Sequence, residues 1–363
     1  MVVKRNQISF RTVFKPALVG VSLFVLTACQ GSIDSLVPKE DRPVPAKLVR
    51  AMKAKGMGTK APIMIRVFKQ SSELEVWKQT HTGRYALLSS YEICKWSGKL
   101  GPKFKEGDRQ APEGFYNVNK HQMNPRSSFH LSFNMGFPNT YDRSHGRTGS
   151  HLMVHGACSS AGCYSMTDEQ VEVIYALARD AFDGGQKSFQ MQAYPFRMTT
   201  KNMVKYKDHK HFKFWQMLKR GHDHFEITRK PPKVDVCGKR YVFNTTSKGR
   251  YASTSSCPAM KMPAALASAF TKKQEKYVSE FEKLAGKSGT DQIAALSPVS
   301  FKTALPGITV DQPVTKVVAP KEEATPPAGK TTLEEVKATP KVVAPAKAAP
   351  AKSDLEATLK PAG

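Results

Sequence analysis

Residues 151–166 read HLMVHGACSSAGCYSM, and this stretch decides both the predicted fold and the predicted chemistry. His155 ends a predicted strand over 151–155, and Cys163 lies between a glycine-containing turn and a predicted helix start at Thr167. We expect a short hairpin-like turn to bring the imidazole to the thiol. A neighbouring imidazole or a helix N-terminus lowers the pKa of a cysteine from about 8.5, which makes the thiol a useful nucleophile.

The same stretch assigns a role to each of five residues. Cys163 is the predicted nucleophile and His155 its base. Gly162 leaves room beside the nucleophile for substrate and for backbone N–H groups, so that with Ser160 it is assigned to the turn and the oxyanion region. Because Gly156 follows the base, an orienting contact to His155 would have to come from a backbone carbonyl.

Hydrophobic periodicity on both sides predicts mostly antiparallel β structure with a packed helix. A hairpin is expected around Ser71-Ser72, formed by strands near 63–67 and 74–76. Further strands are expected at 85–93, 113–118, 129–135, 151–155 and 189–194. Thr167 and Gln170 form a capping box that starts a helix, and Gly184-Gly185 ends it.

The N-terminus predicts export and a lipid anchor. A basic leader is followed by an apolar run over 17–28, which is typical of a secretory signal peptide and too short for a mature transmembrane helix. Residues 26–29 are similar to a bacterial lipobox, so Cys29 is the predicted lipid-attachment site. Gln30 rather than Asp favours delivery to the outer membrane, on the periplasmic side of the envelope. An uncleaved anchor is the alternative.

The formal charge of +26 implies an acidic partner, such as nucleic acid, an anionic membrane or the bacterial wall. Export removes nucleic acid from this set, and a solvated basic face is the plainer alternative. The signal peptide covers 1–28, a tether 29–60 and the folded catalytic domain 61–260. A helix is predicted within 261–296, and a disordered tail rich in Pro, Ala and Lys within 297–363.

Five cysteines remain once Cys29 carries lipid. Cys237 and Cys257 bracket a stretch rich in Gly, Ser and Thr and are predicted to form a local disulfide. Cys94 and Cys158 either pair or are buried thiols. The odd number suggests that one thiol stays free, as a nucleophile would.

Two motifs together resemble the hallmark of the YkuD-like L,D-transpeptidase catalytic domain: His155-Gly156 and Ser160-Ala161-Gly162-Cys163. Residues 105–116 resemble the Thr-Pro-x-Gly-x-Tyr/Phe region of the same family. The match is closest to the YafK-like branch, which is resembled by residues 139–149, residues 154–168, Phe214-Trp215 and residues 241–243. The resemblance covers roughly residues 45–260 and implies a β-sandwich catalytic domain. The chain departs from the general family at Ala161 and at Tyr164-Ser165, which replaces an Ile/Val-Arg pair whose arginine helps to hold substrate there.

The resemblance implies acyl transfer at peptidoglycan stem peptides. Cys163 would attack a carbonyl beside meso-diaminopimelate, and an amine or water would resolve the thioester. The enzyme would therefore be an L,D-transpeptidase, or an amidase that releases a wall-linked lipoprotein, and it would need no cofactor.

Two other readings compete with this one. In the first, His151, His155, Cys158 and Cys163 bind zinc, although a Cys-x4-Cys spacing lacks the usual tight knuckle. In the second, the chain is a non-catalytic lipoprotein whose basic surface grips the wall, against which the intact His155–Cys163 pair argues.

Overall fold

The computed structural model describes residues 37–286 and the two-residue strand β15 (Ile308–Thr309). The predicted signal peptide, the lipid attachment at Cys29 and nearly all of the predicted tail lie outside these residues. Within the described ranges, no helix is both long enough and apolar enough to cross a membrane.

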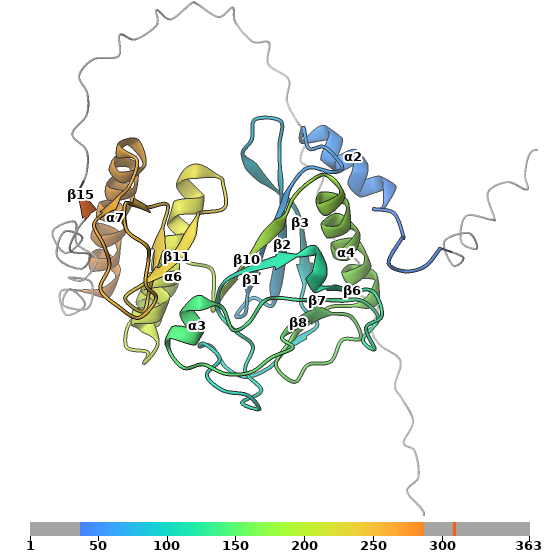
Figure 1. The fold of residues 1–363 in the computed structure, drawn as a ribbon, viewed down its shortest axis with the longest axis horizontal. Coiled ribbons are helices and arrows are strands. Elements are labelled where there is room, and N and C mark those ends of the chain that lie inside the picture. Colours follow the sequence, from blue (N-terminus) through green and yellow to red (C-terminus); the bar gives the residue numbers. More distant parts are fainter. Residues whose placement is uncertain (1–36, 287–307, 310–363) are drawn as a thin grey trace, which may run out of the picture. The chain divides into compact units, whose positions relative to one another are not determined.

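The larger sheet has the strand order β3-β2-β1-β10-β5 (Figure 1). Its strands are β1 (Ile63–Phe68), β2 (Glu73–Gln79), β3 (Tyr85–Glu92), β5 (Gly114–Asn119) and β10 (Ser188–Tyr194). The predicted hairpin around Ser71-Ser72 is confirmed, since β1 and β2 pair in antiparallel fashion. The central pair β1–β10 is parallel, so within this sheet the prediction of mostly antiparallel structure holds with this exception.

The second five-stranded sheet carries the 151–166 stretch and has the order β4-β9-β8-β7-β6. All of its strands are short: β4 (Lys95–Trp96), β6 (Met123–Asn124), β7 (Ser132–Asn134), β8 (Met153–His155) and β9 (Tyr164–Ser165). A 3-10 turn (Lys120–Gln122) and helix α3 (Thr140–Ser144) connect parts of this region.

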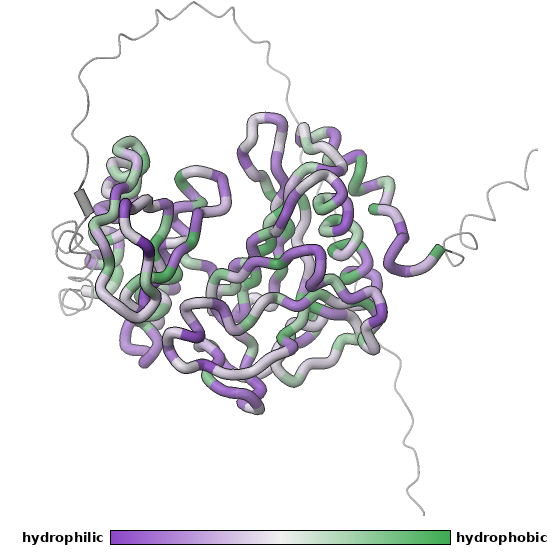
Figure 2. Tube along the Cα trace, viewed as in Figure 1, coloured by the Kyte–Doolittle hydropathy of each residue, from purple (hydrophilic) through white to green (hydrophobic). Residues whose placement is uncertain are grey.

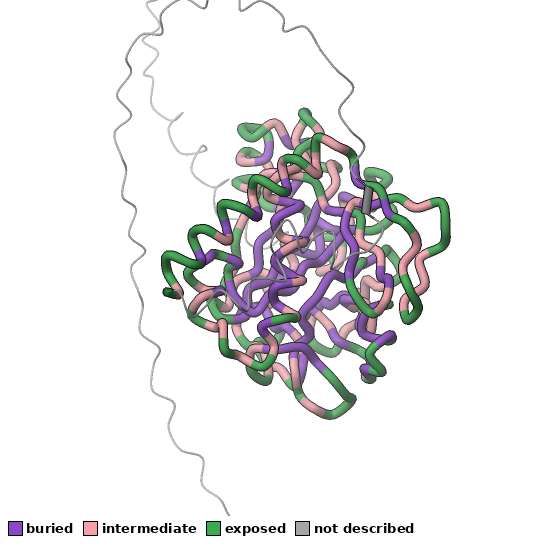
Figure 3. The backbone as a smooth tube through the Cα atoms, turned by 90° about the vertical axis from the view of Figure 1, so that its left-hand side faces the viewer, coloured by how far each residue is buried: buried purple, intermediate pink, exposed green. Residues whose placement is uncertain are grey.

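Helix α4 (Asp168–Asp183) covers one face of the larger sheet. Thr167 and Gln170 form the predicted capping box, and Gly184 follows the last turn. The buried face of α4 packs with Ile63, Ile65 and Val67, which point to the same side of β1 because strand side chains alternate. In the described part of the chain, buried segments lie in the middle and exposed segments lie at the edges (Figure 3). Hydrophobic and hydrophilic residues alternate along much of the backbone (Figure 2).

The predicted tether over 29–60 is wrong for its second half. Residues 46–54 form helix α2 (Ala46–Ala54). The side chains of Met52 and Met57 are 0% and 4% exposed and belong to the core that α4 forms with the larger sheet. The lysines of this helix concealed its short apolar face from the sequence prediction. Burial of that face in the core stabilises the helix.

Helices on the other side of the larger sheet form a second core. They are α5 (Thr200–Lys205), α6 (Phe212–Thr228) and α7 (Ala264–Ala285), with the hairpin β11 (Val234–Cys237) and β12 (Arg240–Phe243) and the short strands β13 (Thr246–Ser247) and β14 (Met260–Lys261). The predicted helix within 261–296 is α7, which contacts α5 and α6 and buries Tyr277 and Phe281 in this core. The folded domain therefore extends beyond the predicted end at residue 260.

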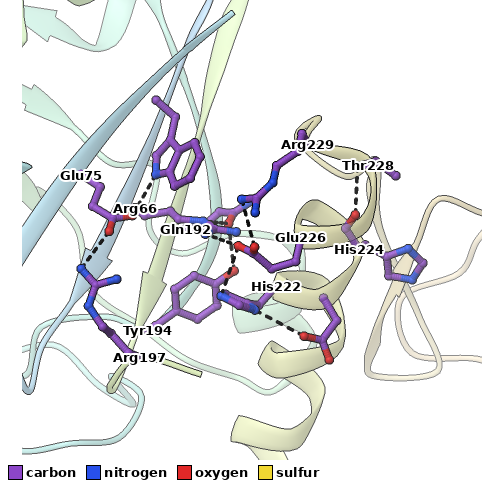
Figure 4. A network of polar contacts seen from close by, with 12 residues as sticks. Arg66, Glu75, Gln192, Tyr194, Arg197, His222, His224, Glu226, Thr228 and Arg229 are labelled. Atoms are coloured by element: carbon purple, nitrogen blue, oxygen red, sulfur yellow. Dashed lines mark hydrogen bonds and ion pairs between the residues drawn. The ribbon is translucent and has the colours of Figure 1, made fainter. Parts of the chain in front are cut away.

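Arg66 joins the larger sheet to α6 in the polar network of Figure 4. Its guanidinium donates to Gln192 Oε1 at 3.1 Å and to Glu226 Oε1 at 2.8 Å, and it lies 4.1 Å from the ring centroid of Phe225. His222 stands beside this network, and burial lowers its pKa to about 4. The sheet–helix junction is thus a buried polar layer in which the imidazole of His222 is neutral at neutral pH.

A fully buried ion pair lies at the end of the same sheet. Lys69 Nζ is 3.0 Å from Glu113 Oε1, and neither side chain is exposed. Glu113 also accepts from the backbone N–H of Gly101 at 2.7 Å and from Trp215 Nε1 at 2.8 Å. Lys69 donates to Gly101 O at 2.9 Å. The pair therefore connects β1, the 99–101 loop, the segment before β5 and helix α6.

We expect Glu113→Gln to lower the free energy of unfolding by about 3–5 kcal/mol, because it leaves the Lys69 ammonium buried without a counter-charge. Denaturant unfolding followed by tryptophan fluorescence measures this loss. Lys120→Gln breaks the exposed Lys120–Asp183 pair, whose side chains are 68% and 42% exposed, and serves as the control with a change of less than about 1 kcal/mol. Equal effects of the two substitutions would contradict the importance of the buried pair.

Candidate functional site

Cys163 and His155 line one cavity of about 500 Å³. Its wall is built by three segments, over residues 103–109, 149–155 and 159–163, together with Phe129. The structure thus brings the predicted nucleophile and base to the same cavity: His155 ends strand β8, and Cys163 directly precedes strand β9.

The two strands that position this pair are parallel. Val154 pairs with Tyr164, and His155 with Ser165. The expected hairpin-like turn is therefore wrong: the chain loops back over residues 156–163 and enters β9 in the same direction as β8. Because Val154 and Tyr164 are buried in the core, alternation places His155 and Cys163 together on the other side of these strands.

The imidazole of His155 is held by the backbone. Nδ1 lies 2.6 Å from Gly156 O, which fits the tautomer that donates from Nδ1 and leaves Nε2 free to accept a proton. The Phe129 ring lies over it, with centroids 4.8 Å apart. Burial lowers the pKa of His155, so the ring is neutral at neutral pH. A backbone carbonyl thus provides the orienting contact that the sequence suggested.

Gly156 is required by its surroundings. A Cβ at this position would lie 2.4 Å from Asp168 Oδ1, which accepts from the backbone N–H of Ala157 at 2.7 Å. The Gly156 N–H itself lies within hydrogen-bonding distance of the carbonyls of Phe129 and Leu131. A larger residue would push the loop away from α4 and disturb the carbonyl that orients His155.

The thiol of Cys163 is half-buried, and it is the free cysteine among the described residues. Its Sγ accepts from Met153 N at 3.4 Å and lies 3.7 Å from His151 O. Burial raises the pKa of Cys163, while the Met153 N–H and the charge of Lys103 act in the opposite direction. The lowered pKa expected from the sequence is therefore not found, and the cavity holds a neutral thiol and a neutral imidazole.

Ser160 and Gly162 shape the turn that precedes the thiol. Ser160 Oγ donates to Cys163 O at 2.8 Å and accepts from Gly162 N at 3.3 Å. Gly162 has φ +139°, a conformation that favours glycine. With its N–H directed to Ser160, Gly162 serves the turn rather than the oxyanion region.

The remaining cysteines form two disulfides, Cys94–Cys158 and Cys237–Cys257. The first was an open alternative in the sequence and fastens the loop between His155 and Cys163. It also removes Cys158 from the zinc set, because a disulfide sulfur is not a thiolate ligand. Among residues 37–286, no group of three or more His, Cys, Asp or Glu side chains is arranged to hold a metal ion.

Two cationic side chains that line the cavity, Lys103 and Arg109, were not predicted as site residues from the sequence. Lys103 is only 4% exposed and donates to Asp108 Oδ1 at 2.5 Å and to Lys105 O at 2.9 Å. Arg109 lies on the same loop and is exposed at the cavity. Asp108 organises this loop, since it also accepts from the backbone N–H groups of Phe104, Lys105 and Gln110. No local pattern marks these cations, because folding alone brings them to a cysteine far along the chain.

Comparison with known proteins gives concordant results. The L,D-transpeptidase catalytic domain family YkuD matches residues 64–186. The chain is 47% identical to "Putative L,D-transpeptidase YafK" of Escherichia coli (strain K12) over 182 residues, which cover 50% of this chain and 74% of that protein. The same figures hold for the protein of that name in Escherichia coli O157:H7.

Solved structures that match this chain include two bacterial proteins. The helical cell shape determining protein Pgp2 from Campylobacter jejuni is 17% identical, with a TM-score of 0.30 over 52% of this chain and 79% of that chain. Bd1075 from Bdellovibrio bacteriovorus is 15% identical, with a TM-score of 0.26 over 48% of this chain and 76% of that chain. The identity to YafK over most of its length, with the family match to the segment that contains the cavity residues, shows that this chain belongs to the YkuD family of L,D-transpeptidase catalytic domains.

Proposed function

We propose that this protein is a peptidoglycan-modifying acyl-transfer enzyme in which Cys163 is the nucleophile and His155 is the general base. The observation that carries the proposal is the shared cavity, whose lining includes a free thiol and an imidazole with an available Nε2. Membership of the L,D-transpeptidase family supports peptidoglycan as the substrate.

In the first half-reaction, His155 Nε2 takes the thiol proton as Cys163 Sγ attacks a carbonyl beside meso-diaminopimelate. The tetrahedral adduct collapses to a thioester, and the imidazolium returns the proton to the departing amine. In the second half-reaction, an amine or water attacks the thioester and the thiol is regenerated. Proton transfer in step with attack suits a neutral pair, because the thiolate need not exist beforehand.

The acceptor distinguishes the two forms of this activity. An amine of a second stem peptide gives a crosslink and makes the enzyme an L,D-transpeptidase. Water gives hydrolysis, and with a lipoprotein joined to the wall as the substrate the enzyme would be an amidase that releases it. The lipobox-like sequence ending at Cys29 supports a lipid anchor that holds the domain at the periplasmic side of the outer membrane.

We further assign Lys103 and Arg109 to the carboxylates of the stem peptide. The arginine that follows the nucleophile in the general family is absent here, where Tyr164 and Ser165 follow Cys163. Lys103 and Arg109 supply positive charge in the lining of the same cavity. Arg109 can offer a carboxylate two parallel hydrogen bonds, while the Lys103 ammonium donates two hydrogen bonds to described residues and has a third donor.

Cys163→Ala should abolish product formation from purified peptidoglycan, and His155→Ala should lower kcat by about 100-fold to 10,000-fold. Mass spectrometry of the released and crosslinked fragments measures both effects on wall with and without bound lipoprotein. Wild-type and Cys163→Ala proteins that give identical products on every wall substrate would favour the non-catalytic wall-binding lipoprotein instead.

The pH dependence of the site should report a neutral pair. Because burial lowers the pKa of His155, the acid limb of kcat/KM should lie below 6.5, with activity lost as the imidazole becomes protonated. Because burial raises the pKa of Cys163, its alkylation by iodoacetamide should still accelerate above about pH 9. An alkylation rate that is already constant from pH 6 upward, measured on the Cys163 peptide, would show a preformed thiolate and refute this account.

Arg109→Gln should raise KM by about 10-fold for a stem peptide with free diaminopimelate carboxylates, since a charge-assisted hydrogen bond is lost. The same substitution should change KM little for a stem peptide whose diaminopimelate carboxylates are amidated. Lys105→Gln is the control, because Lys105 belongs to the same loop but does not line the cavity. Equal losses on the free and amidated peptides would remove Arg109 from carboxylate recognition.

A further inference from the structure

We propose that the segment 94–97, through the Cys94–Cys158 disulfide and Ser97, is a positioning element for the nucleophile, which holds Cys163 in the geometry that His155 requires. The inference rests on the proposed function only in that its first readout is turnover. A second readout, the reactivity of the Cys163 thiol, is independent of the substrate.

The strands alone provide little to hold the thiol in place. Cys163 is followed by the two-residue strand β9, which pairs with β8 at only two positions, Val154–Tyr164 and His155–Ser165. The connection over residues 156–163 is far shorter than the dozen or more residues that usually join parallel strands. A ladder of this length restrains the loop weakly, so its conformation must be fixed from outside.

The loop has a backbone that needs such an external restraint. Ala157 and Cys158 are consecutive non-glycine residues with φ +59° and +46°. Left-handed conformations of this kind are unfavourable for residues with a Cβ and persist where the surroundings enforce them. Here Asp168 Oδ1 accepts from Ala157 N, the disulfide fixes Cys158, and Cys158 N donates to Met166 O at 3.2 Å.

The segment 94–97 contacts the loop again on both sides of the disulfide. Lys95 and Trp96 pair with Ser165 and Tyr164 as strand β4, and Ser165 Oγ donates to Lys95 O at 2.9 Å. Ser97 Oγ lies 2.8 Å from Ser160 O and 2.9 Å from Ser160 Oγ. Ser160 in turn donates to Cys163 O, so one chain of contacts runs from Ser97 to the residue that carries the thiol.

The same segment is itself anchored to rigid parts of the fold. Trp96 Nε1 donates to Ser72 Oγ at 3.3 Å in the turn between β1 and β2, and Ile93 N donates to Ser72 O at 2.7 Å. Ala111 N donates to Ser97 O at 3.0 Å and links the segment to the loop that carries Lys103 and Arg109. Reducing the Cys94–Cys158 disulfide would break the covalent bond that joins the segment 94–97 to the middle of the loop over residues 156–163.

The chain contains a matched control for this idea. Cys237–Cys257 closes a loop of sequence separation 20 away from the cavity, whereas Cys94–Cys158 has a separation of 64. Both should stabilise the fold by restricting the unfolded chain, but only the second should act on catalysis. Cys158 is exposed, so a dithiol reductant can reach this bond and convert it to two thiols as the reductant is oxidised.

The test compares the full-length chain with Cys94→Ala/Cys158→Ala and with Cys237→Ala/Cys257→Ala. We expect kcat on peptidoglycan to fall about 100-fold in the first variant, with KM nearly unchanged, because small misplacement of a reacting group has effects of this size. The pH profile of Cys163 alkylation by iodoacetamide should move toward that of a free cysteine in the same variant. The second variant should retain the wild-type kcat and alkylation profile.

A complementary arm adds dithiothreitol to the Cys237→Ala/Cys257→Ala protein, in which Cys94–Cys158 is the disulfide left to reduce among the described residues. Activity should be lost while the circular dichroism stays native, and reoxidation should restore the activity.

A folded Cys94→Ala/Cys158→Ala protein with unchanged kcat and alkylation profile would overturn the proposal. Loss of circular dichroism in step with activity would also overturn it, since the bond would then stabilise the whole domain. A wild-type protein inactive on every wall substrate would refute the proposed function alone, because the alkylation profiles still test the positioning.

Discussion

The buried ion pair between Lys69 and Glu113 is the constraint on which the rest of the structure depends. Two charges without solvent are tolerated only when their remaining hydrogen-bonding capacity is used, and here the 99–101 loop and Trp215 of α6 provide the partners. The ammonium of Lys69 also lies 5.5 Å from the ring centroid of Trp96. One buried ion pair therefore connects the larger sheet, helix α6 of the second core, the 99–101 loop and, through Trp96, the segment 94–97 that contacts the loop over residues 156–163.

The chemistry of the cavity follows from burial more than from charge. A thiol and an imidazole that are both poorly solvated favour their neutral forms, and the lysine nearby offsets this only in part. The arrangement separates two tasks. In the mechanism we propose, His155, oriented by the Gly156 carbonyl, transfers the proton, while Lys103 and Arg109 contact the charges of the substrate.

Local patterns in the sequence predicted the five strands of the larger sheet, the capped helix α4, helix α7 and the placement of His155 and Cys163 at one cavity. These features depend on alternation, capping and a short motif, all of which act over a few residues. Three predictions failed where distant segments decide the outcome. Helix α2 owes its existence to packing, β8 and β9 are parallel because of the wider sheet, and the thiol pKa is set by burial. Lys103 could not have been found, because its role depends on a fold that joins distant loops.

The half-buried, neutral thiol of Cys163 has a consequence for the chemical lifetime of the protein. Peroxides and other oxidants attack thiolates far faster than thiols, and overoxidation to the sulfinic or sulfonic acid is in practice irreversible. A cysteine that gives up its proton only to His155, during attack on a bound acyl group, spends little time in the vulnerable form. If the protein is exported as we propose, the unpaired sulfur of Cys163 would then survive many turnovers in an oxidising compartment.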